Sequence, residues 1–392
     1  MDSNFNNFIF DFPQKIVCER GGINRLDEFI NEYGFRKIMI VTDQGLVKTG
    51  LIGKIESILK KSNINYIKFD TIEPNPSVKT IKYGENIGRK EKIDSLLGIG
   101  GGSCIDAAKA VGILITNGGS IEEYSGLDKY KKKPLPIIAV PTTAGTGSES
   151  SPSAVITNSK TKDKMSIFSK KGLPIMALLD AEVLTTIPTH IAASTGMDAL
   201  SHAIESFVSL KAFPISDSLA SKAIKLIGRY LRAFVANRKN IEAAQAMLIA
   251  SNLAGISFSH TYLGDVHALS HPLGGYYNIP HGVVNAILLP HVMKFNMISN
   301  LEKFKDIAIF LGEKVDTLNN IESANKAVES VRKLSKDLNI PKNLREIGVK
   351  EDGIDNIVKV AERTRNALVN PRTTTIEDFK DIYKNALQWN KF

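Results

Sequence analysis

The sequence predicts an α/β fold in its N-terminal half and an all-helical fold in its C-terminal half. In the first half, apolar β-branched runs alternate with segments whose apolar residues recur at helical spacing, the order of a parallel sheet covered by helices on both faces. From residue 187 onward helical spacing continues and strand-like runs nearly vanish. We therefore predict an α/β domain over residues 1–186 and an all-helical domain over residues 187–392.

The elements of both predicted domains follow from the same spacing argument. Strands are predicted at residues 37–42, 64–69, 94–100 and 136–140. Helices of the α/β domain are predicted at residues 51–61, 78–92 and 105–115, and the last of these follows its strand through a run of glycines. Helices of the second domain are predicted at residues 191–209, 214–236, 239–259, 261–272, 299–311, 321–337 and 350–366.

Composition and charge exclude several classes of protein. The 392 residues include two cysteines, Cys18 and Cys104, which cannot form a disulfide framework and suit a reducing compartment. Gly, Pro or charge interrupts every apolar stretch before the roughly 18 residues of a membrane span, and the N-terminus lacks a basic segment. The net charge of +9 comes from scattered lysines without interleaved aromatics, which indicates a solvated surface. We expect a cytoplasmic protein that binds neither nucleic acid nor membrane.

Histidine placement gives the strongest chemical signal. All seven histidines lie between residues 190 and 291. Asp198 and His202 are four residues apart, as are His267 and His271, so on a helix each pair projects from one face. His281 follows in the sequence IPHG. One carboxylate with three or four imidazoles suits a divalent metal, and three neutral imidazoles with one carboxylate leave the loaded site a charge of about +1. A Glu is missing between the paired histidines, so this is not the HExxH pattern of metalloproteases.

Two loops that follow strands are candidates for binding a nucleotide. The turn GIGGGSCIDAAKA at residues 98–110 leads from a strand into a helix, where backbone N–H groups can hold a pyrophosphate. It departs from GxGxxG because Ser103 occupies the third glycine position, and tight packing alone would also explain it. The loop PTTAGTGSE at residues 141–149 brings hydroxyl groups to the carboxyl end of a strand, where parallel sheets bind ligands, although a capping role is also open.

These signals occur in an order that resembles the iron-containing (group III) alcohol dehydrogenase family over nearly the whole chain. The resemblance implies a dinucleotide-binding α/β domain, a metal-binding helical domain, and hydride transfer between NAD(H) and a small alcohol or aldehyde, as in lactaldehyde reductases and 1,3-propanediol dehydrogenases. The segments that support it, of which the last two are the most specific, are VTDQGLVKTG (41–50), PNP (74–76), GGGSCIDAAK (100–109), PTTAGTGSE (141–149), TGMDALSHAIE (195–205) and HALSHPLGGYYNIPHGVVNAILLPHV (267–292).

Transferred position by position, the resemblance implies a complete metal site. The ligands would be Asp198, His202, His267 and His281. His271 would lie beside the metal in the substrate cleft, where its imidazole could relay the hydroxyl proton. The family implies iron(II), and the same ligands also accept zinc. The family further implies a homodimer or a larger homo-oligomer.

The resemblance also implies a cofactor site on the loops that follow the strands of the α/β domain. Glycines would approach the pyrophosphate and threonine hydroxyls would line the cofactor. Asp43 at the end of a strand would face the adenosine ribose and so favour NADH over NADPH. The residues implied in cofactor binding are Asp43, Asn75, Gly101, Gly102, Ser103, Thr142, Thr143, Thr146 and Lys164.

Several positions depart from the family pattern. Cys104 stands where relatives commonly carry Pro, and the chain after Glu149 reads SSPSAVITN. His260 and Asp265 are unusual beside the segment with the ligand histidines. These positions lie near the expected substrate cleft. They therefore leave the identity of the substrate open, but they do not change the expected reaction.

Other functions remain open from the residues alone. A metal-dependent hydrolase would use the ion to activate water, but its reaction does not require loops that bind a dinucleotide. A nucleotide-binding protein with a structural metal is another class. Within the same scaffold, a polyol dehydrogenase of the glycerol type is a further alternative.

Overall fold

The computed structural model describes residues 7–158 and 163–388, and the chain divides into two compact units. The first unit is Phe12–Ile187, and the second joins the residues from Pro188 onward to the described N-terminal residues as far as Asp11. Phe8 stacks on Phe213 with ring centroids 4.7 Å apart, which attaches the N-terminal segment to the helices of the second unit.

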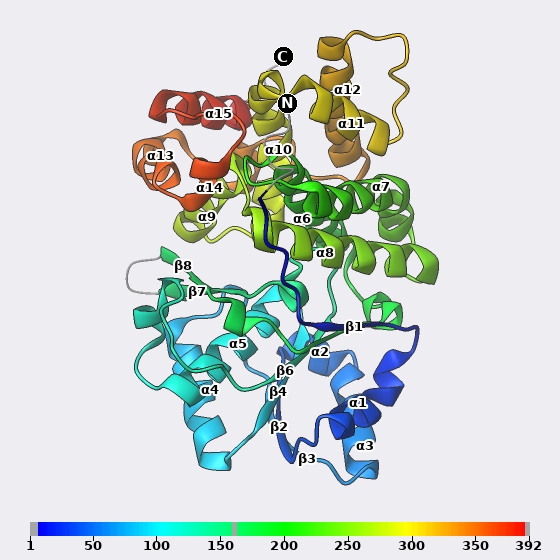
Figure 1. Cartoon of the computed structure of the whole chain (residues 1–392), viewed down its shortest axis with the longest axis vertical. Coiled ribbons are helices and arrows are strands. Elements are labelled where there is room, and N and C mark those ends of the chain that lie inside the picture. The colour runs from blue at the N-terminus through cyan, green and yellow to red at the C-terminus, as the bar shows by residue number, and fades with distance from the viewer. Residues whose placement is uncertain (1–6, 159–162, 389–392) are drawn as a thin grey trace. The chain divides into compact units, whose positions relative to one another are not determined.

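A six-stranded sheet forms the centre of the first unit, with the strand order β1-β9-β6-β4-β2-β3 and parallel pairing throughout (Figure 1). The adjacent strands β6, β4 and β2 are buried almost throughout, which explains why their sequences read as continuous apolar runs. The strands of this sheet are β1 (Lys15–Cys18), β2 (Lys37–Val41), β3 (Asn65–Phe69), β4 (Ser95–Gly100), β6 (Ile137–Pro141) and β9 (Met176–Leu179).

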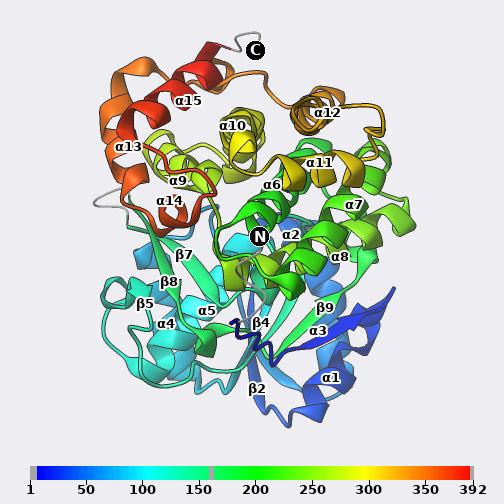
Figure 2. The ribbon, with the colours of Figure 1, turned by 45° about the horizontal axis from the view of Figure 1, so that its top comes forward.

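Helices cover both faces of this sheet (Figures 1 and 2). One face carries α4 packed on α5, and the other carries α1 packed on α3. A smaller sheet, ordered β5-β8-β7, completes the unit. The remaining elements are α1 (Leu26–Glu32), α2 (Gln44–Lys48), α3 (Leu51–Lys61), α4 (Val78–Glu91), α5 (Gly102–Asn117), β5 (Gly126–Leu127), β7 (Ser153–Asn158) and β8 (Asp163–Phe168).

The second unit consists of helices, and the described part of it contains no strand. The predicted fold class, a parallel α/β region followed by a helical region, is therefore confirmed. The helices are α6 (Thr189–Val208), α7 (Pro214–Ala236), α8 (Ile241–Thr261), α9 (Asp265–Tyr277), α10 (His281–Asn296), α11 (Leu301–Phe310), α12 (Asn320–Asp337), α13 (Ile354–Glu362), α14 (Arg365–Val369) and α15 (Ile376–Gln388).

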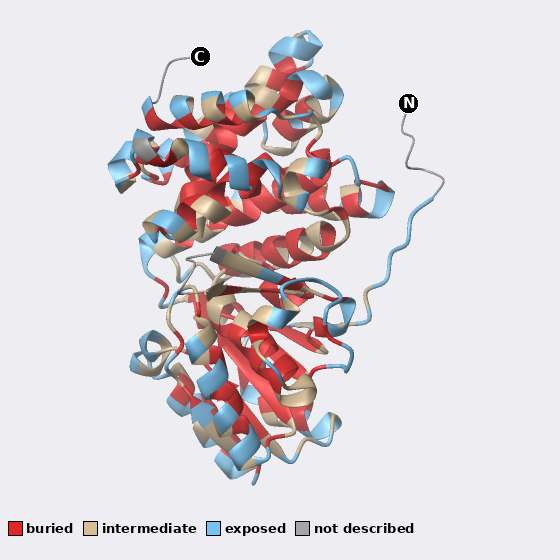
Figure 3. Cartoon of the chain, turned by 90° about the vertical axis from the view of Figure 1, so that its left-hand side faces the viewer, coloured by how far each residue is buried: buried red, intermediate tan, exposed pale blue. Residues whose placement is uncertain are grey.

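The centre of the helical unit is α6, which packs against α7, α8 and α10 and is buried along most of its length. Figure 3 shows how buried and exposed residues are distributed over the ribbon. By length and composition α8 could cross a membrane, and it is the one such helix in the described parts of the chain. However, 67% of its most apolar window is buried inside the protein. An apolar helix buried in this way is typical of the centre of a packed helical bundle.

Several helical segments differ from the prediction. The helix expected at residues 261–272 begins only at Asp265, because the chain leaves α8 at Tyr262, whose φ is +58°. The segment 350–366 splits into α13 and α14, since Thr364 caps a new helix. The helices α10 and α15 are not among the predicted elements, and Pro290 inside α10 hides its continuity.

Candidate functional site

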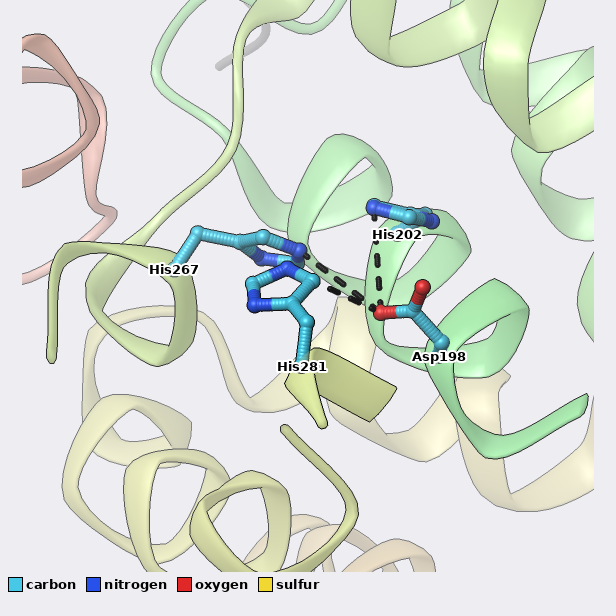
Figure 4. Close-up of side chains that lie close together, drawn as sticks. All are labelled: Asp198, His202, His267 and His281. Atoms are coloured by element: carbon cyan, nitrogen blue, oxygen red, sulfur yellow. Dashed lines mark ion pairs between the residues drawn. The ribbon is translucent and has the colours of Figure 1, made fainter. Parts of the chain in front are cut away.

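Four side chains from three helices converge in the helical unit (Figure 4). Asp198 and His202 lie on α6, His267 lies on α9, and His281 is the first residue of α10. Oδ1 of Asp198 is 3.9 Å from Nε2 of His202 and 4.0 Å from Nε2 of both His267 and His281. One potential ligand atom from each residue lies within 4.8 Å of the others.

Local structure explains why these residues meet. The four-residue spacing on α6 puts Asp198 and His202 on one face. The glycine after His281 lets α10 begin close to α6, because a Cβ at Gly282 would lie 2.6 Å from the backbone oxygen of Ser194. Any larger residue there would push His281 away from Asp198. The sequence PHG is therefore a packing requirement of the cluster.

The cluster fits a divalent metal ion. Two atoms that each bind an ion at about 2.1 Å cannot be more than about 4.2 Å apart, and the three distances from Asp198 meet this limit. Asp198, His202 and His267 are buried, and His281 retains partial exposure. A carboxylate and three imidazoles present lone pairs to a shared point, and burying them together is costly without a compensating cation.

A buried carboxylate beside the cluster, Glu205, fixes the orientation of His267. Oε2 of Glu205 lies 2.5 Å from Nδ1 of His267, and its Oε1 accepts from the backbone N–H of Val266 at 2.6 Å. This contact occupies Nδ1 and leaves Nε2 facing Asp198. Burial lowers the pKa of His267 well below its usual range and raises the pKa of Glu205 to about 7. The imidazole is therefore neutral, as a metal ligand must be.

Asn285 is a member of the site that the sequence analysis missed. It follows His281 by one turn of α10 and is fully buried. Its Nδ2 lies 2.6 Å from Oδ1 of Asp198 and 3.0 Å from Nε2 of both His267 and His281. Glu205 was missed as well. The signal that could have found both is helical spacing, since Asn285 is four residues after His281 and Glu205 is seven after Asp198.

His271 lies beside the cluster, as the family resemblance implies. Its ring centroid is 5.1 Å from that of His281 and 5.8 Å from that of His267. It comes from α9, one turn after His267, and is partly exposed. A partly exposed imidazole next to the four donors can exchange a proton with solvent. Its role as a proton relay remains a prediction.

In the α/β unit, the residues expected to bind the cofactor follow the carboxyl ends of adjacent strands. The strands β2, β4 and β6 are neighbours in the sheet, and their last residues are followed by Asp43, the glycine turn and the threonine loop. Pairing of Gly100 with Pro141 brings the second and third of these together. Such an edge of a parallel sheet is the common place for ligands.

The glycine turn and the threonine loop pack directly on each other. A Cβ at Gly102 would lie 2.8 Å from Cγ2 of Thr146 and 2.9 Å from its Oγ1, so only glycine fits there. A Cβ at Gly101 would make an ordinary contact with Thr143 at 3.5 Å. The N–H of Thr142 donates to the carbonyl of Gly100 at 3.0 Å. The two glycines thus allow the threonine loop to pack closely against the start of α5.

Other predicted cofactor residues belong to the same region. The backbone N–H of Asn75, a residue with φ of +57°, donates to Oγ of Ser103 at 3.3 Å. Lys164 on β8 pairs with Thr157, whose N–H donates to the carbonyl of Pro76 at 2.8 Å. The contacts link the PNP segment both to the glycine turn and to the strand that carries Lys164.

Asp43 caps the helix that follows its strand. Its Oδ1 accepts from the N–H of Leu46 at 3.0 Å, and its Oδ2 accepts from the thiol of Cys104 at 3.4 Å. Burial, and then the neighbouring carboxylate, raise the pKa of Cys104 well above its usual range, so the thiol stays protonated and can donate. Cys104 thus contributes a thiol donor to Asp43.

A buried ion pair behind the glycine turn was also missed. Lys109 on α5 is fully buried, and its Nζ donates to Oδ1 of Asp106, Oγ of Ser148 and the carbonyl of Ser153 at 3.3, 2.9 and 2.6 Å. Oδ2 of Asp106 accepts from the N–H of Val155 at 2.9 Å. This network fastens the helix after the glycine turn to the threonine loop and to β7.

The two unusual residues of the helical unit lie outside the cluster. Asp265 begins α9 and is buried, with Oγ1 of Thr374 donating to its Oδ2 at 2.5 Å. Burial raises the pKa of this carboxyl well above its usual range. His260 ends α8 and stacks on Phe10 with ring centroids 4.7 Å apart. Both residues contact terminal segments of the chain.

The sequence matches two family models along most of its length. Residues 13–181 match the model described as iron-containing alcohol dehydrogenase, and residues 192–387 match the C-terminal model of the Fe-containing alcohol dehydrogenase family. The chain belongs to the iron-containing alcohol dehydrogenase family. Membership confirms the family resemblance and the interpretation as an alcohol dehydrogenase, and it disfavours the hydrolase alternative.

Several members of the iron-containing alcohol dehydrogenase family are similar over almost the full chain. The identity is 42% to the 1,3-propanediol dehydrogenase of Citrobacter freundii, over 90% of this chain and 92% of that protein. It is 39% to the NAD-dependent methanol dehydrogenase of Bacillus methanolicus, over 96% and 99%. The solved structure of an alcohol dehydrogenase from Oenococcus oeni has a TM-score of 0.94 at 39% identity, covering 96% of this chain and 100% of that one.

Proposed function

We propose that this protein is a metal-dependent, NAD(H)-linked dehydrogenase that interconverts small alcohols and aldehydes. The observation that supports it best is the cluster of Asp198, His202, His267 and His281, whose potential ligand atoms lie within 4.8 Å of one another. The chain also belongs to a family of alcohol dehydrogenases. Relatives named for NAD-dependent methanol and 1,3-propanediol dehydrogenation support the same reaction and cofactor.

The four clustered side chains would hold the ion, and we propose iron(II) as the resident metal, with zinc as the alternative. When bound there, a divalent ion supplies a Lewis acid for the substrate oxygen. Glu205 keeps Nδ1 of His267 occupied and so keeps the ring in the orientation for binding. We propose that His271, beside the ligands, accepts the hydroxyl proton during alcohol oxidation and returns it during aldehyde reduction.

In the α/β unit, the glycine-rich start of α5 would hold the pyrophosphate of NAD(H) through its backbone N–H groups. The threonines of the loop after β6 would line the cofactor, and Asp43 would accept from a ribose hydroxyl. NAD(H) supplies the hydride chemistry, whereas the protein supplies binding and orientation. We also expect a homodimer or larger assembly, which sedimentation would test.

The direct test combines metal content with a substrate panel. Purified protein is loaded anaerobically with iron(II) or with zinc, and NADH oxidation is followed with small aldehydes and lactaldehyde, while NAD reduction is followed with primary alcohols, 1,3-propanediol and glycerol. We expect turnover that depends on the ion and is greatest with iron(II). Equal turnover in demonstrably metal-free protein would refute the proposal, and a strong preference for glycerol would favour a polyol dehydrogenase.

A further inference from the structure

Asn285 contacts three of the four residues of the candidate metal site. Its Nδ2 contacts Oδ1 of Asp198 and Nε2 of both His267 and His281, at 2.6, 3.0 and 3.0 Å. These are three of the four atoms proposed above as ligands. A single buried amide nitrogen thus lies where a shared ion would bind.

The NH₂ group of Asn285, rather than its carbonyl, faces the cluster. A carboxylate oxygen only accepts, so the atom 2.6 Å from Asp198 Oδ1 must be a donor. The NH₂ group has two hydrogens and lies within hydrogen-bond distance of three acceptors. On its other side, Oδ1 of Asn285 is buried and has no hydrogen-bond partner among the residues that the structure describes. The amide is therefore held only by the atoms of the cluster.

The amide nitrogen and a metal ion cannot share this position. An ion bound to imidazole lies about 2.0–2.1 Å from its nitrogen, so it would overlap with an atom 2.6–3.0 Å from the same three groups. In addition, Nε2 of a neutral imidazole has one lone pair. Each ring can therefore accept from Asn285 or bind the ion, but cannot do both.

We propose that Asn285 is a positioning residue that closes the metal-free site and competes with the ion for its ligands, an inference that rests on the proposed function. In metal-free protein, its amide donates to the clustered acceptors and keeps Asp198, His267 and His281 converged. Loading with an ion displaces the amide. Asn285 therefore stabilises the metal-free form more than the loaded form, and by linkage it weakens metal affinity.

The test measures metal affinity and thermal stability rather than turnover. Wild type and Asn285→Ala are titrated with Zn²⁺, and with Fe²⁺ anaerobically, in competition with a chromophoric chelator, and each is melted with and without the ion. Because the metal-free form of Asn285→Ala loses the hydrogen bond from the amide to the charged Asp198, we expect about tenfold tighter metal binding in this variant. We also expect a larger loss of Tm in metal-free protein than in loaded protein.

Asn296→Ala is the matched control, because it removes a second buried amide from α10 that contacts Asn370 instead of the cluster. It should lower Tm equally with and without the ion and leave metal affinity unchanged. Unchanged or weaker affinity in Asn285→Ala would overturn the proposal.

A second variant keeps the test decisive if Asn285→Ala does not fold. Asn285→Leu has nearly the same size but can neither donate a hydrogen bond nor bind an ion, so it should also bind Zn²⁺ more tightly than wild type. Unchanged or weaker affinity of this variant would overturn the proposal too. A wild-type protein that binds neither ion would refute the proposed function itself. A wild type that binds an ion, with Asn285 variants that bind it no more tightly, would refute only the role of Asn285.

Discussion

The candidate metal site and the candidate cofactor site are built in different ways. In the helical unit, the chemistry lies in side chains whose donor atoms face each other across three helices. In the α/β unit, it lies mainly in the backbone at the carboxyl ends of strands, while the side chains there contact one another. Thr146 fills the space beside Gly102, Ser103 accepts from Asn75, and Asp43 caps α2.

This difference sets the size of the effect that a substitution should have. Removing one proposed metal donor deletes a quarter of the candidate ligand set. Removing one side chain near the glycine turn leaves in place the backbone N–H groups that would bind the cofactor. We therefore expect the largest losses of activity from substitutions in the metal cluster. Substitutions of residues that support either site should cause intermediate losses of stability or metal affinity. Substitutions of side chains near the cofactor should change the preference between NADH and NADPH rather than abolish cofactor binding.

The largest effect is expected for His267→Ala. His267 contributes both a ligand nitrogen and the contact to Glu205. Because losing an outer partner of a ligand alone costs about 10–100-fold, losing the ligand should reduce turnover by more than about 100-fold. Metal analysis and NADH titration check this, with metal content lost and NADH binding retained. His260→Ala, outside the cluster, should keep the metal, and a His267 variant with normal metal content would contradict the site.

The next largest effect is expected for Lys109→Met in the α/β unit. It leaves the carboxylate of Asp106 without its buried partner, and breaking a buried pair from one side costs about 3–5 kcal/mol. Denaturant unfolding should show this loss. Lys90→Met, an exposed change on α4, should alter the free energy of unfolding by less than about 0.5 kcal/mol. Equal stability of the two variants would mean that the network around Lys109 contributes little.

The same contrast explains what could be predicted from the sequence. The candidate metal cluster could be predicted in part because Asp198 and His202 are four residues apart, a spacing that puts both on one face of a helix. The central strands were identifiable because β4 and β6 are buried on both faces and read as apolar runs. The predicted family and fold class are confirmed, whereas the assignment of individual residues to metal or cofactor remains to be tested.

Residues that act through tertiary contacts could not be predicted. Asn285 and Glu205 lie on the same helices as predicted ligands, but an Asn or Glu at helical spacing is common on any exposed helix face. Only the packing of α10 and α9 against α6 shows that both are buried against ligand atoms. Likewise, the sequence places Lys109 near the glycine turn but cannot show that its charge is buried against Asp106.

A smaller effect is expected for Glu205→Gln. Each carboxylate oxygen of Glu205 contacts one donor, the N–H of Val266 or Nδ1 of His267. Glutamine has one oxygen and one NH₂ group in these places, so it can accept from only one of the two donors. Outer partners of this kind change metal affinity by about 10–100-fold, so we expect Zn²⁺ affinity to fall by at least about tenfold. Glu242→Gln, which alters only an exposed contact with Tyr230, is the control. Unchanged affinity in Glu205→Gln would show that His267 keeps its orientation without this carboxylate.

The smallest effect, on cofactor preference, is expected at Asp43. Because its carboxylate caps α2 and contacts Cys104, a substitution changes both local stability and charge. Asn is as good a cap as Asp, so Asp43→Asn removes the charge and keeps the cap, whereas Asp43→Gly removes both. Repulsion between Asp43 and a ribose 2′-phosphate predicts that each variant raises the ratio of NADPH to NADH efficiency by about tenfold.

Steady-state kinetics of both Asp43 variants with NADH and with NADPH separates the effect of the charge on cofactor preference from the effect of the helix cap. Asn319→Gly removes the cap of α12 in the helical unit, so it should cost a few tenths of a kcal/mol and leave the cofactor ratio unchanged. If Asp43→Gly raises the ratio but Asp43→Asn does not, the space opened by glycine, and not the charge, is the selector. If neither variant changes it, Asp43 serves only as a helix cap, and the backbone of the glycine turn binds both cofactors alike.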